Sequence, residues 1–390
     1  MSRLDVVPTR PRDNGSDRVR PRVATTVTQF WHRVPGGTAT SIAQLVAAVA
    51  DRGDVDQVLV GARGVPPDDG FALPLGIPSA SLPLPVAALY DSWDRFGRPR
   101  IEPVAGGVDL IHLTVPMGPP ACRVPLVATV HDVFPLTRPE WFSRRGVRLM
   151  SRALLRIRER AAVVMVPSQA VADDCLAHGF DAARLSVVPW GSRPVSVTGE
   201  EVDAARRRHG LIGPYVLFVG TVEPRKGLPV LTDALARIGR ADLTLVVAGP
   251  LGWGLDAAAC LSSVPGPVIR TGFLPVAELD ALRAGSAVCC APSWAEGFGL
   301  PALEALAAGA PLVTSAGTAL AEVAGSAALT VPPGRGDLLA DAVARLLDDD
   351  DLASELRSAG PRRASEFTWS ATAAATVETY RRVINGRARR

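Results

Sequence analysis

The stretch AVCCAPSWAEGFGLPALEALAAGAPLVTS, residues 287 to 315, contains one complete unit of the fold that we predict. Its ends, residues 287–293 and 311–315, are short apolar runs typical of buried strands. Between them, Pro301 suits a first helical turn and Gly309 suits a helix stop. The stretch therefore predicts a strand, a loop, a helix and a parallel second strand.

The same alternation of short apolar runs and helical patterns occupies most of the chain. In the first half, strands are predicted at residues 23–30, 55–61, 108–115, 125–132, 162–168 and 184–191. In the second half, they are predicted at residues 215–221, 243–250, 268–273, 287–293, 311–315 and 327–333. This pattern predicts an α/β protein with two doubly wound, Rossmann-like domains joined near residues 191–213.

The length of 390 residues also favours two domains over one core. We expect a disordered basic arm at residues 1–22 and domains at residues 23–195 and 196–365. Residues 366–390 should form a closing helix and a basic tail that packs back towards the first domain. A cleft between the two domains is the first place to look for a site.

The composition indicates a globular protein, with 47% hydrophobic and 21% charged residues. No run is apolar enough to be a membrane span, and the N-terminus has no apolar signal core. The five cysteines show no Cys-x-x-Cys spacing, so we expect reduced thiols in a cytoplasmic protein. The arginines lack interleaved aromatic residues, and no nucleic-acid partner is expected.

Lys226 is the only lysine among the 42 lysines and arginines of the chain. A chain that otherwise uses arginine suggests a position where a guanidinium would not serve. An ammonium group is a compact point charge, whereas a guanidinium is a wide planar fork. A narrow anion pocket around Lys226 is therefore the hypothesis, with chance as the alternative.

Two loops that follow predicted strands of the first domain carry unusual residues. In HRVPGGTATS, residues 32 to 41, Gly36 and Gly37 allow backbone N–H groups to approach an anion at a helix start. A simple tight turn is the alternative. In TVHDVFPLTRPEW, residues 129 to 141, His131 follows a strand directly and can face a ligand, although single histidines are usually structural.

Two further loops belong to the second domain. In VGTVEPRKG, residues 219 to 227, Arg225 and Lys226 stand just ahead of a helix, an arrangement suited to a pyrophosphate. A solvated basic turn is the alternative. Glu296 and Glu304 lie eight positions apart around a Gly-Phe-Gly-Leu-Pro turn, where two carboxylates could hold hydroxyls at opposite ends of one ligand.

These loops together resemble the retaining glycosyltransferases of family 4, which have the GT-B fold. The family's E-x7-E motif is matched by EGFGLPALE, residues 296 to 304, and its phosphate-binding loop by GTVEPRKG, residues 220 to 227. The resemblance runs from about residue 23 to 385. It implies two domains that face a central cleft, with the acceptor side on the first domain and the nucleotide-sugar donor on the second.

The resemblance also implies roles for individual residues. Arg225 and Lys226 would hold the donor's diphosphate, Glu304 the ribose hydroxyls, and Glu296 the hydroxyls of the transferred sugar. The remaining predicted contacts are backbone N–H groups of Phe298, Gly299 and Leu300, the diphosphate contact of Gly36 and Gly37, and a place for His131 beside the donor sugar. The loop departs from the family pattern at residues 38–40, which leaves the acceptor undefined.

The implied reaction is metal-independent transfer of a hexose, with retention, to a hydroxyl of a glycan or glycolipid. The form of the loops favours mannose from GDP-mannose, no cofactor, and a role in polysaccharide or glycolipid biosynthesis. The alternatives are a GT-B nucleotide-sugar epimerase and a non-catalytic nucleotide-sugar-binding protein.

A basic helix is predicted within residues 142–162. It carries arginines at successive fourth positions, namely Arg144, Arg148, Arg152, Arg156 and Arg160, with apolar residues on another face. Such a helix could lie on the anionic inner face of the plasma membrane and make the enzyme peripheral. The alternative is a helix that covers the first sheet with a solvated basic face.

Overall fold

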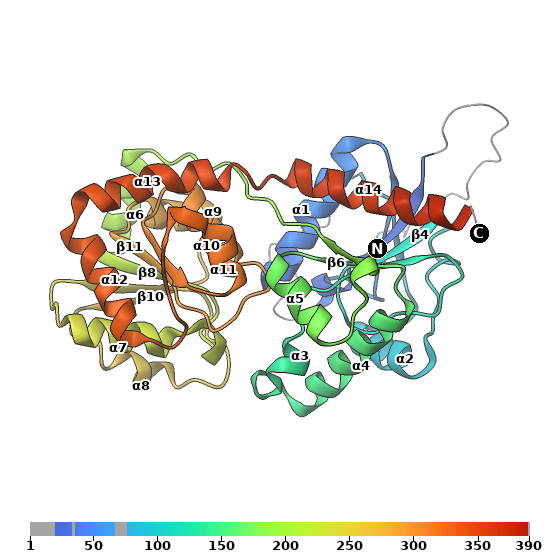
Figure 1. Ribbon diagram of the computed structural model, residues 1–390, viewed down its shortest axis with the longest axis horizontal. Helices are drawn as coiled ribbons and strands as arrows, with labels where there is room; N and C mark the ends of the chain where they lie inside the picture. Colours follow the sequence, from blue (N-terminus) through green and yellow to red (C-terminus); the bar gives the residue numbers. More distant parts are fainter. Residues whose placement is uncertain (1–19, 33–35, 67–75, 389–390) are drawn as a thin grey trace. The chain divides into compact units, whose positions relative to one another are not determined.

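A computed structural model describes residues 20–32, 36–66 and 76–388. The chain forms two compact units. Unit 1 consists of Met1–Gly191 and Trp369–Arg390, and unit 2 consists of Ser192–Thr368 (Figure 1). Most of the predicted arm, residues 1–19, lies outside the described residues, but Arg22 already belongs to the first strand. The boundaries between the units therefore lie after residue 191 and after residue 368. The predicted boundaries lay after residue 195 and after residue 365.

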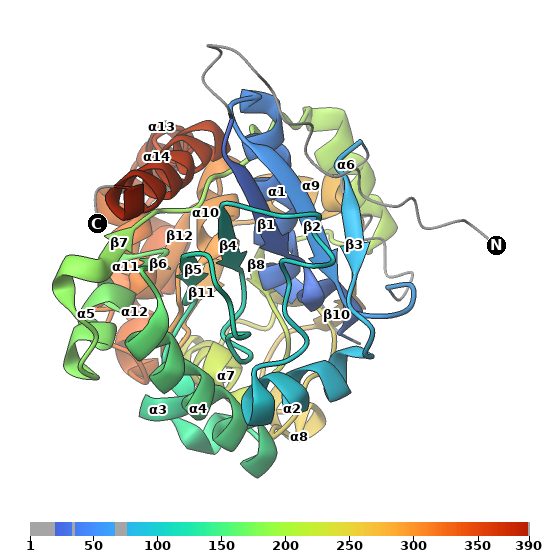
Figure 2. The ribbon, with the colours of Figure 1, turned by 90° about the vertical axis from the view of Figure 1, so that its right-hand side faces the viewer.

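Unit 1 contains one parallel sheet of seven strands in the order β3-β2-β1-β4-β5-β6-β7, which Figure 2 shows from edge to edge. The strands are β1 (Arg22–Thr26), β2 (Asp56–Gly61), β3 (Ser79–Ser81), β4 (Leu110–Leu113), β5 (Leu126–Thr129), β6 (Val163–Val166) and β7 (Leu185–Val187). The helices are α1 (Gly36–Arg52), α2 (Val86–Phe96), α3 (Phe134–Thr137), α4 (Arg144–Arg160), α5 (Gln169–Ala177) and α14 (Trp369–Ala388), with 3-10 turns η1 (Thr28–Trp31), η2 (Pro139–Trp141) and η3 (Ala182–Arg184).

Both faces of this sheet are covered, which is why its central strands are apolar at successive positions. Leu126 and Ala128 point into a core that they share with Leu154 of α4 and Trp93 of α2. Val127, between them, belongs to the opposite core, which contains residues of α1 and α14. The C-terminal helix is thus a layer of unit 1, although almost 180 residues of unit 2 separate it from β7 in the chain.

Unit 2 repeats the architecture with a parallel sheet of six strands in the order β10-β9-β8-β11-β12-β13. The strands are β8 (Tyr215–Val219), β9 (Thr244–Ala248), β10 (Val268–Gly272), β11 (Val288–Ala291), β12 (Leu312–Ser315) and β13 (Leu329–Val331). The helices are α6 (Gly199–Arg208), α7 (Leu228–Ile238), α8 (Ala257–Leu261), α9 (Val276–Ala284), α10 (Leu300–Ala307), α11 (Ala319–Ala324), α12 (Gly336–Asp348) and α13 (Asp350–Ala364), with 3-10 turns η4 (Pro224–Lys226) and η5 (Gly325–Ala327).

The predicted fold class is confirmed, because each sheet is parallel and reverses its strand order once, beside its first strand. Two details of the first domain were wrong. The strand predicted to reach residue 30 ends at Thr26, because Val27 and Phe30 turn into a small core beneath α1. The edge strand β3 was missed, since its three residues, Ser-Ala-Ser, carry no β-branched or aromatic signal.

The predicted basic helix is α4, and its apolar side is part of the core of unit 1. Leu154 and Ile157 are fully buried against the sheet. On the basic side, Arg156 contacts the carboxylate of Asp94 at 3.4 Å, and Arg160 donates to the carbonyl of Pro120 at 2.8 Å. The apolar face of α4 is therefore used in folding, while Arg144 and Arg148 on the other side are exposed.

Candidate active site

Most of the predicted donor residues of unit 2 lie in loops that follow two neighbouring strands, at the point where the sheet reverses its order. Strands β8 and β11 pair directly, and the loops after them carry residues 220–227 and 292–299. The crevice beyond the carboxyl ends of such strands is where open α/β sheets bind ligands. The topology thus brings the two sequence motifs together although about 70 residues separate them.

Close packing joins the two loops. Gly227 has a φ of +72°, and a Cβ atom there would lie 2.1 Å from the carbonyl oxygen of Pro292. The backbone N–H of Trp294 donates to the carbonyl of Arg225 at 2.8 Å. A glycine is therefore required at position 227 both for the left-handed conformation and for the approach of the second loop.

Glu296 is the centre of the cluster that these loops form. Its Oε2 accepts from Arg225 Nη1 at 2.8 Å, and its Oε1 accepts from Lys226 Nζ at 2.6 Å. Ser293 Oγ also donates to Oε1, at 2.8 Å. Burial alone would raise the pKa of Glu296, but Arg225 and Lys226 outweigh it and lower the pKa to about 2. The carboxyl group is consequently an anion held between two cations.

Arg225 has a second carboxylate partner, which the sequence analysis missed. Its Nη2 donates to Glu223 Oε1 at 2.8 Å, and the Glu223 side chain is only 7% exposed. The cluster thus balances two cations, Arg225 and Lys226, with two carboxylates, Glu223 and Glu296. A bridging position between two acids fixes the guanidinium in one orientation. The motif Glu-x-Arg at positions 223 to 225 was the available signal.

Glu304 lies in the second turn of α10 and has a different partner from Glu296. Its Oε2 accepts from Nη2 of Arg283, a residue of α9 that the sequence analysis also missed. Arg283 in turn donates from Nη1 to Asp280 Oδ1 at 3.0 Å. The Glu304 side chain keeps 30% of its surface exposed.

The turn between the two acids is built around Gly299. This glycine is the N-cap of α10 and has a φ of +103°, and a Cβ atom there would lie 2.5 Å from Leu320. Phe298 is buried, and its ring packs edge-on against Phe367 at 5.8 Å between centroids. Leu300 opens the helix. The side chain of Phe298 therefore anchors the loop within unit 2.

The remaining predicted residues belong to unit 1 and lie beyond the carboxyl ends of its strands. Gly36 and Gly37 open α1 after β1, and His131 follows β5. His131 is buried, donates from Nε2 to the carbonyl of Thr114 at 2.7 Å, and packs edge-on against Trp190. Burial lowers its pKa to about 4, although the Thr114 carbonyl opposes the shift. The ring is neutral near pH 7, and its Nδ1 is an acceptor without a partner in the described parts of the chain.

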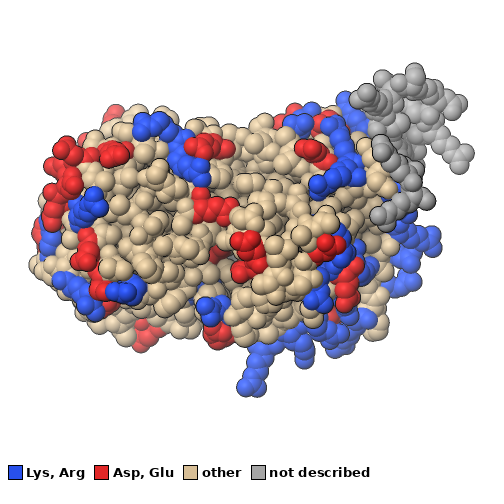
Figure 3. Space-filling model, viewed as in Figure 1, with Lys and Arg blue, Asp and Glu red and all other residues tan. Residues whose placement is uncertain are grey.

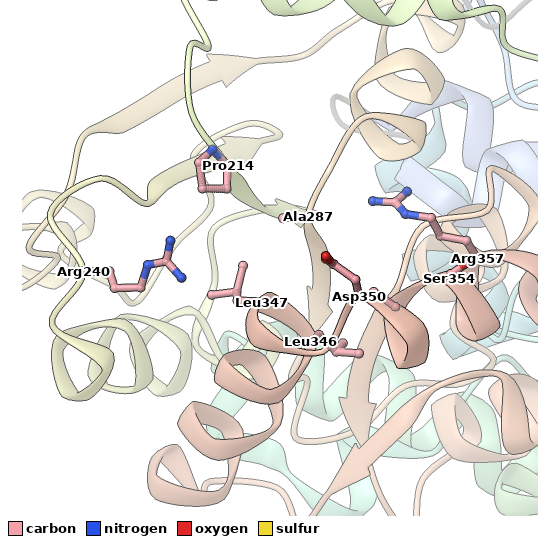
Figure 4. A pocket seen from close by; sticks show the side chains of 9 residues that line it. Pro214, Arg240, Ala287, Leu346, Leu347, Asp350, Ser354 and Arg357 are labelled. Carbon is pink, nitrogen blue, oxygen red and sulfur yellow. The ribbon is translucent and has the colours of Figure 1, made fainter.

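A cavity of about 300 Å³ in unit 2 is not part of this site. It lies at the amino ends of β8 and β11, beside Pro214 and Ala287 (Figure 4). Its two cations already have partners, since Arg240 contacts Asp242 at 2.9 Å and Arg357 donates to the carbonyl of Ser286 at 2.6 Å. The residues of the two motifs lie beyond the carboxyl ends of the same strands, on the other side of the sheet from the cavity.

Metal and membrane features were searched among residues 20–32, 36–66 and 76–388. Within them, no three His, Cys, Asp or Glu side chains are grouped as metal ligands. All five cysteines are free thiols. None of the helices in these ranges combines the length and apolarity that crossing a membrane requires.

Two doubly wound parallel sheets of this order are the architecture of the GT-B class. Residues 35–195 match the family model described as Glycosyltransferase Family 4, and residues 213–349 match the one described as Glycosyl transferases group 1. The chain belongs to glycosyltransferase family 4.

Individual relatives agree with this assignment. The phosphatidyl-myo-inositol mannosyltransferase of Mycobacterium leprae is 30% identical over 383 residues, which are 90% of this chain and 94% of the relative. The O-antigen chain mannosyltransferase B of Escherichia coli is 28% identical over 265 residues, 65% of this chain and 70% of the relative.

Among solved structures, sucrose-phosphate synthase from Thermosynechococcus elongatus has a TM-score of 0.73 and 22% identity, covering 94% of this chain and 100% of that one. The Anabaena protein HepE, solved with UDP-glucose, has a TM-score of 0.72 and 19% identity, covering 92% of this chain and 99% of that one. These two structures support the fold.

Proposed function

We propose that the protein transfers mannose from GDP-mannose to a hydroxyl group of a glycan or glycolipid, with retention at the anomeric carbon and without a metal ion. The observation that carries the proposal is the joint contact of Arg225 and Lys226 with Glu296 at the switch point of unit 2. The two relatives, both mannosyltransferases by name, favour mannose as the transferred sugar.

Arg225 and Lys226 are the groups that bind the diphosphate in this proposal. Breaking a glycosyl–phosphate bond develops negative charge on the leaving diphosphate, and fixed cations stabilise that charge in the transition state. Their side chains are 21% and 13% exposed, so water screens them weakly. A diphosphate would be bound by these two cations beside Glu296.

We assign Glu296 to the hydroxyls of the transferred sugar. With Arg225 and Lys226 beside it, its carboxylate stays ionised and accepts hydrogen bonds from sugar hydroxyls. We assign Glu304 to the ribose hydroxyls, and the backbone N–H groups of Phe298, Gly299 and Leu300 to the sugar and phosphate.

We also propose roles for the predicted residues of unit 1. We assign the N–H groups of Gly36 and Gly37, at the start of α1, to the diphosphate. We assign the neutral ring of His131 to the donor sugar, where its Nδ1 accepts from a hydroxyl. A leaving phosphate oxygen, rather than a side chain, takes the proton of the acceptor hydroxyl as the new glycosidic bond forms.

Donor binding is tested by thermal-shift measurements with GDP-mannose, UDP-glucose, UDP-N-acetylglucosamine, GDP and UDP. We expect stabilisation by GDP-mannose and GDP, and its loss in Lys226→Ala. Arg237→Ala is the matched control, because Arg237 is an exposed cation of α7 paired with Asp233. Stabilisation by uridine nucleotides alone would contradict GDP-mannose as the donor and indicate a uridine-diphosphate sugar in its place.

Catalysis is tested separately by incubating the protein and GDP-mannose with mixtures of glycans and glycolipids as acceptors. Transfer in the presence of EDTA, with an α-linked product by NMR, would support retention without a metal. Binding without turnover in every acceptor mixture would favour a nucleotide-sugar-binding protein, and isomerisation of the donor alone would favour an epimerase.

We further propose that unit 1 contacts anionic membranes through charge alone. Arginine side chains gather along the edge where Figure 1 places α2, α3 and α4 (Figure 3). Arg144, Arg145 and Arg148 are exposed there. Leu154 and Ile157 on the apolar face of α4 are buried, so binding should rest on charge and be weak and sensitive to salt.

The membrane proposal is tested by sedimentation with phosphatidylglycerol vesicles at low salt. Arg144→Gln with Arg148→Gln should reduce the bound fraction several-fold, while Arg237→Gln with Arg362→Gln should leave it unchanged. Equal loss in both double variants would indicate a non-specific effect of net charge and contradict the proposal.

A further inference from the structure

Arg283 is a buried cation whose position needs an explanation. It lies in the last turn of α9, and its side chain is 2% exposed. Removing a guanidinium from water is costly unless opposite charges surround it. Two carboxylates do so: Asp280 accepts from Nη1 at 3.0 Å, and Glu304 accepts from Nη2.

Stability alone does not account for this arginine. Buried ion pairs can often be replaced by apolar side chains of similar size at no loss of stability. In addition, Nε of Arg283 is buried without a hydrogen-bond partner in the described parts of the chain. The presence of a buried arginine at position 283 is therefore better explained by the side chains that it holds in place than by a contribution to stability.

The arginine belongs to a row of alternating charges that ends at Glu304. Arg193 contacts Asp280, Asp280 contacts Arg283, and Arg283 contacts Glu304. The row starts beside the point where the chain enters unit 2, and there the N–H of Ser192 donates to the carbonyl of Phe367 at 2.9 Å. Arg283 is thus fixed from behind by Asp280, which Arg193 holds in turn.

Glu304 is held on one side only. Its Oε2 is used by Arg283, whereas among the described residues Oε1 has no partner in the structure. The side chain remains 30% exposed. A carboxylate with one oxygen fixed presents the other in a defined direction, which a pair of neighbouring hydroxyl groups requires.

We propose that Arg283 is a positioning residue that orients Glu304 towards the ribose diol of the donor nucleotide, with Asp280 holding Arg283 in place. The inference rests on the proposed function, because it assumes that Glu304 binds the ribose. It adds that the preference for a ribose diol depends on a residue that does not touch the nucleotide.

The test compares a nucleoside diphosphate with its 2′,3′-dideoxy form by calorimetry, using both the guanosine and the uridine pair. The wild type should bind the ribose form at least tenfold more tightly. Glu304→Gln should lose most of that preference, and so should Arg283→Met. The double variant should be no worse than either single variant, because both changes remove one arrangement.

The dideoxy nucleotide also serves as the folding control. Its affinity should be the same in the wild type and in Arg283→Met, since the base and diphosphate contacts remain. If Arg283→Met does not fold, Arg283→Lys takes its place, because it keeps the charge but cannot contact both carboxylates as a fork. Arg237→Met, on the exposed face of α7, should change neither affinity.

The possible failures are distinguishable. A wild type that binds no nucleotide would overturn the proposed function and this inference with it. A wild type that binds, with a preference lost in Glu304→Gln but kept in Arg283→Met and Arg283→Lys, would overturn the inference alone. A preference that survives Glu304→Gln would show that Glu304 does not bind the ribose, and would overturn the inference as well.

Discussion

The side chain of Lys226 is largely buried against a carboxylate. Its ammonium group lies 2.6 Å from Glu296, and the side chain is 13% exposed. A guanidinium is wider and planar, so it would have to displace Glu296. This geometry gives a physical reason for a single lysine in a chain that otherwise uses arginine.

The prediction at this scale concerns Lys226→Arg. We expect a loss of nucleoside diphosphate affinity of about tenfold or more, or about 1.4 kcal/mol, although the charge is conserved. Calorimetric titration with GDP measures it, with Arg237→Lys as the control for an exposed arginine. Wild-type affinity in Lys226→Arg would mean that the site distinguishes charge but not shape.

At the scale of elements, a buried hydrogen-bonded row attaches the C-terminal helix to the sheet of unit 1. Tyr380 of α14 and His112 Nδ1 of β4 are 2.7 Å apart, and His112 Nε2 lies 2.7 Å from Thr129 Oγ1 of β5. Both rings are fully buried, so neither can exchange its partner for water. The row therefore defines where α14 sits on the sheet.

We expect Tyr380→Phe to destabilise unit 1 by about 1–3 kcal/mol, because it leaves a polar atom of buried His112 without a partner. Urea unfolding of the full chain measures the effect. Arg382→Ala, an exposed change on the same helix, should alter the free energy of unfolding by less than about 0.5 kcal/mol. Equal effects of the two variants would contradict the role of the hydroxyl group.

At the scale of the whole molecule, the two units should respond differently to acid. Burial lowers the pKa of His112 to about 3 and that of His131 to about 4, against 6.5 for an exposed histidine. Between pH 6.5 and 4 these histidines therefore bind protons in the unfolded chain but not in folded unit 1. The free energy of unfolding of unit 1 consequently decreases as the pH falls. For His131 alone the loss amounts to about 3 kcal/mol.

Hydrogen exchange measures this difference strand by strand. Amides of β4 and β5 in unit 1 should lose protection between pH 6.5 and 4, after correction for intrinsic rates, while those of β8 and β11 in unit 2 should keep it. Unit 2 contains a single histidine, His209. Parallel loss of protection in both units would contradict the assignment to His112 and His131.

The order of the units along the chain leads to a further prediction at this scale. Unit 2 is one continuous segment, Ser192–Thr368, whereas unit 1 needs Trp369–Arg390 to cover one face of its sheet. Val377 and Tyr380 of α14 are buried there against Val23 and Val127. We expect residues 192–368 to fold alone, and residues 1–191 alone to remain partly unfolded by circular dichroism and to recover only as the full chain. A cooperative unfolding transition of residues 1–191 would contradict this.

The sequence by itself determined what depends on neighbours in the chain. The alternation of apolar runs predicted two doubly wound sheets, and Pro301 and Gly309 indicated where one helix starts and stops. These are local signals, because a strand, a turn and a helix start each depend on a few consecutive residues. The E-x7-E motif and the Arg-Lys pair were readable for the same reason.

Only the tertiary structure decided which charged groups meet. Nothing in the spacing of Glu296 and Glu304 predicts that one contacts Arg225 and Lys226 while the other contacts Arg283. Likewise, no local pattern pairs Tyr380 with His112, 268 positions away. Such contacts depend on strand order, register and side-chain direction, which arise when distant segments pack together and which periodicity along the chain does not record.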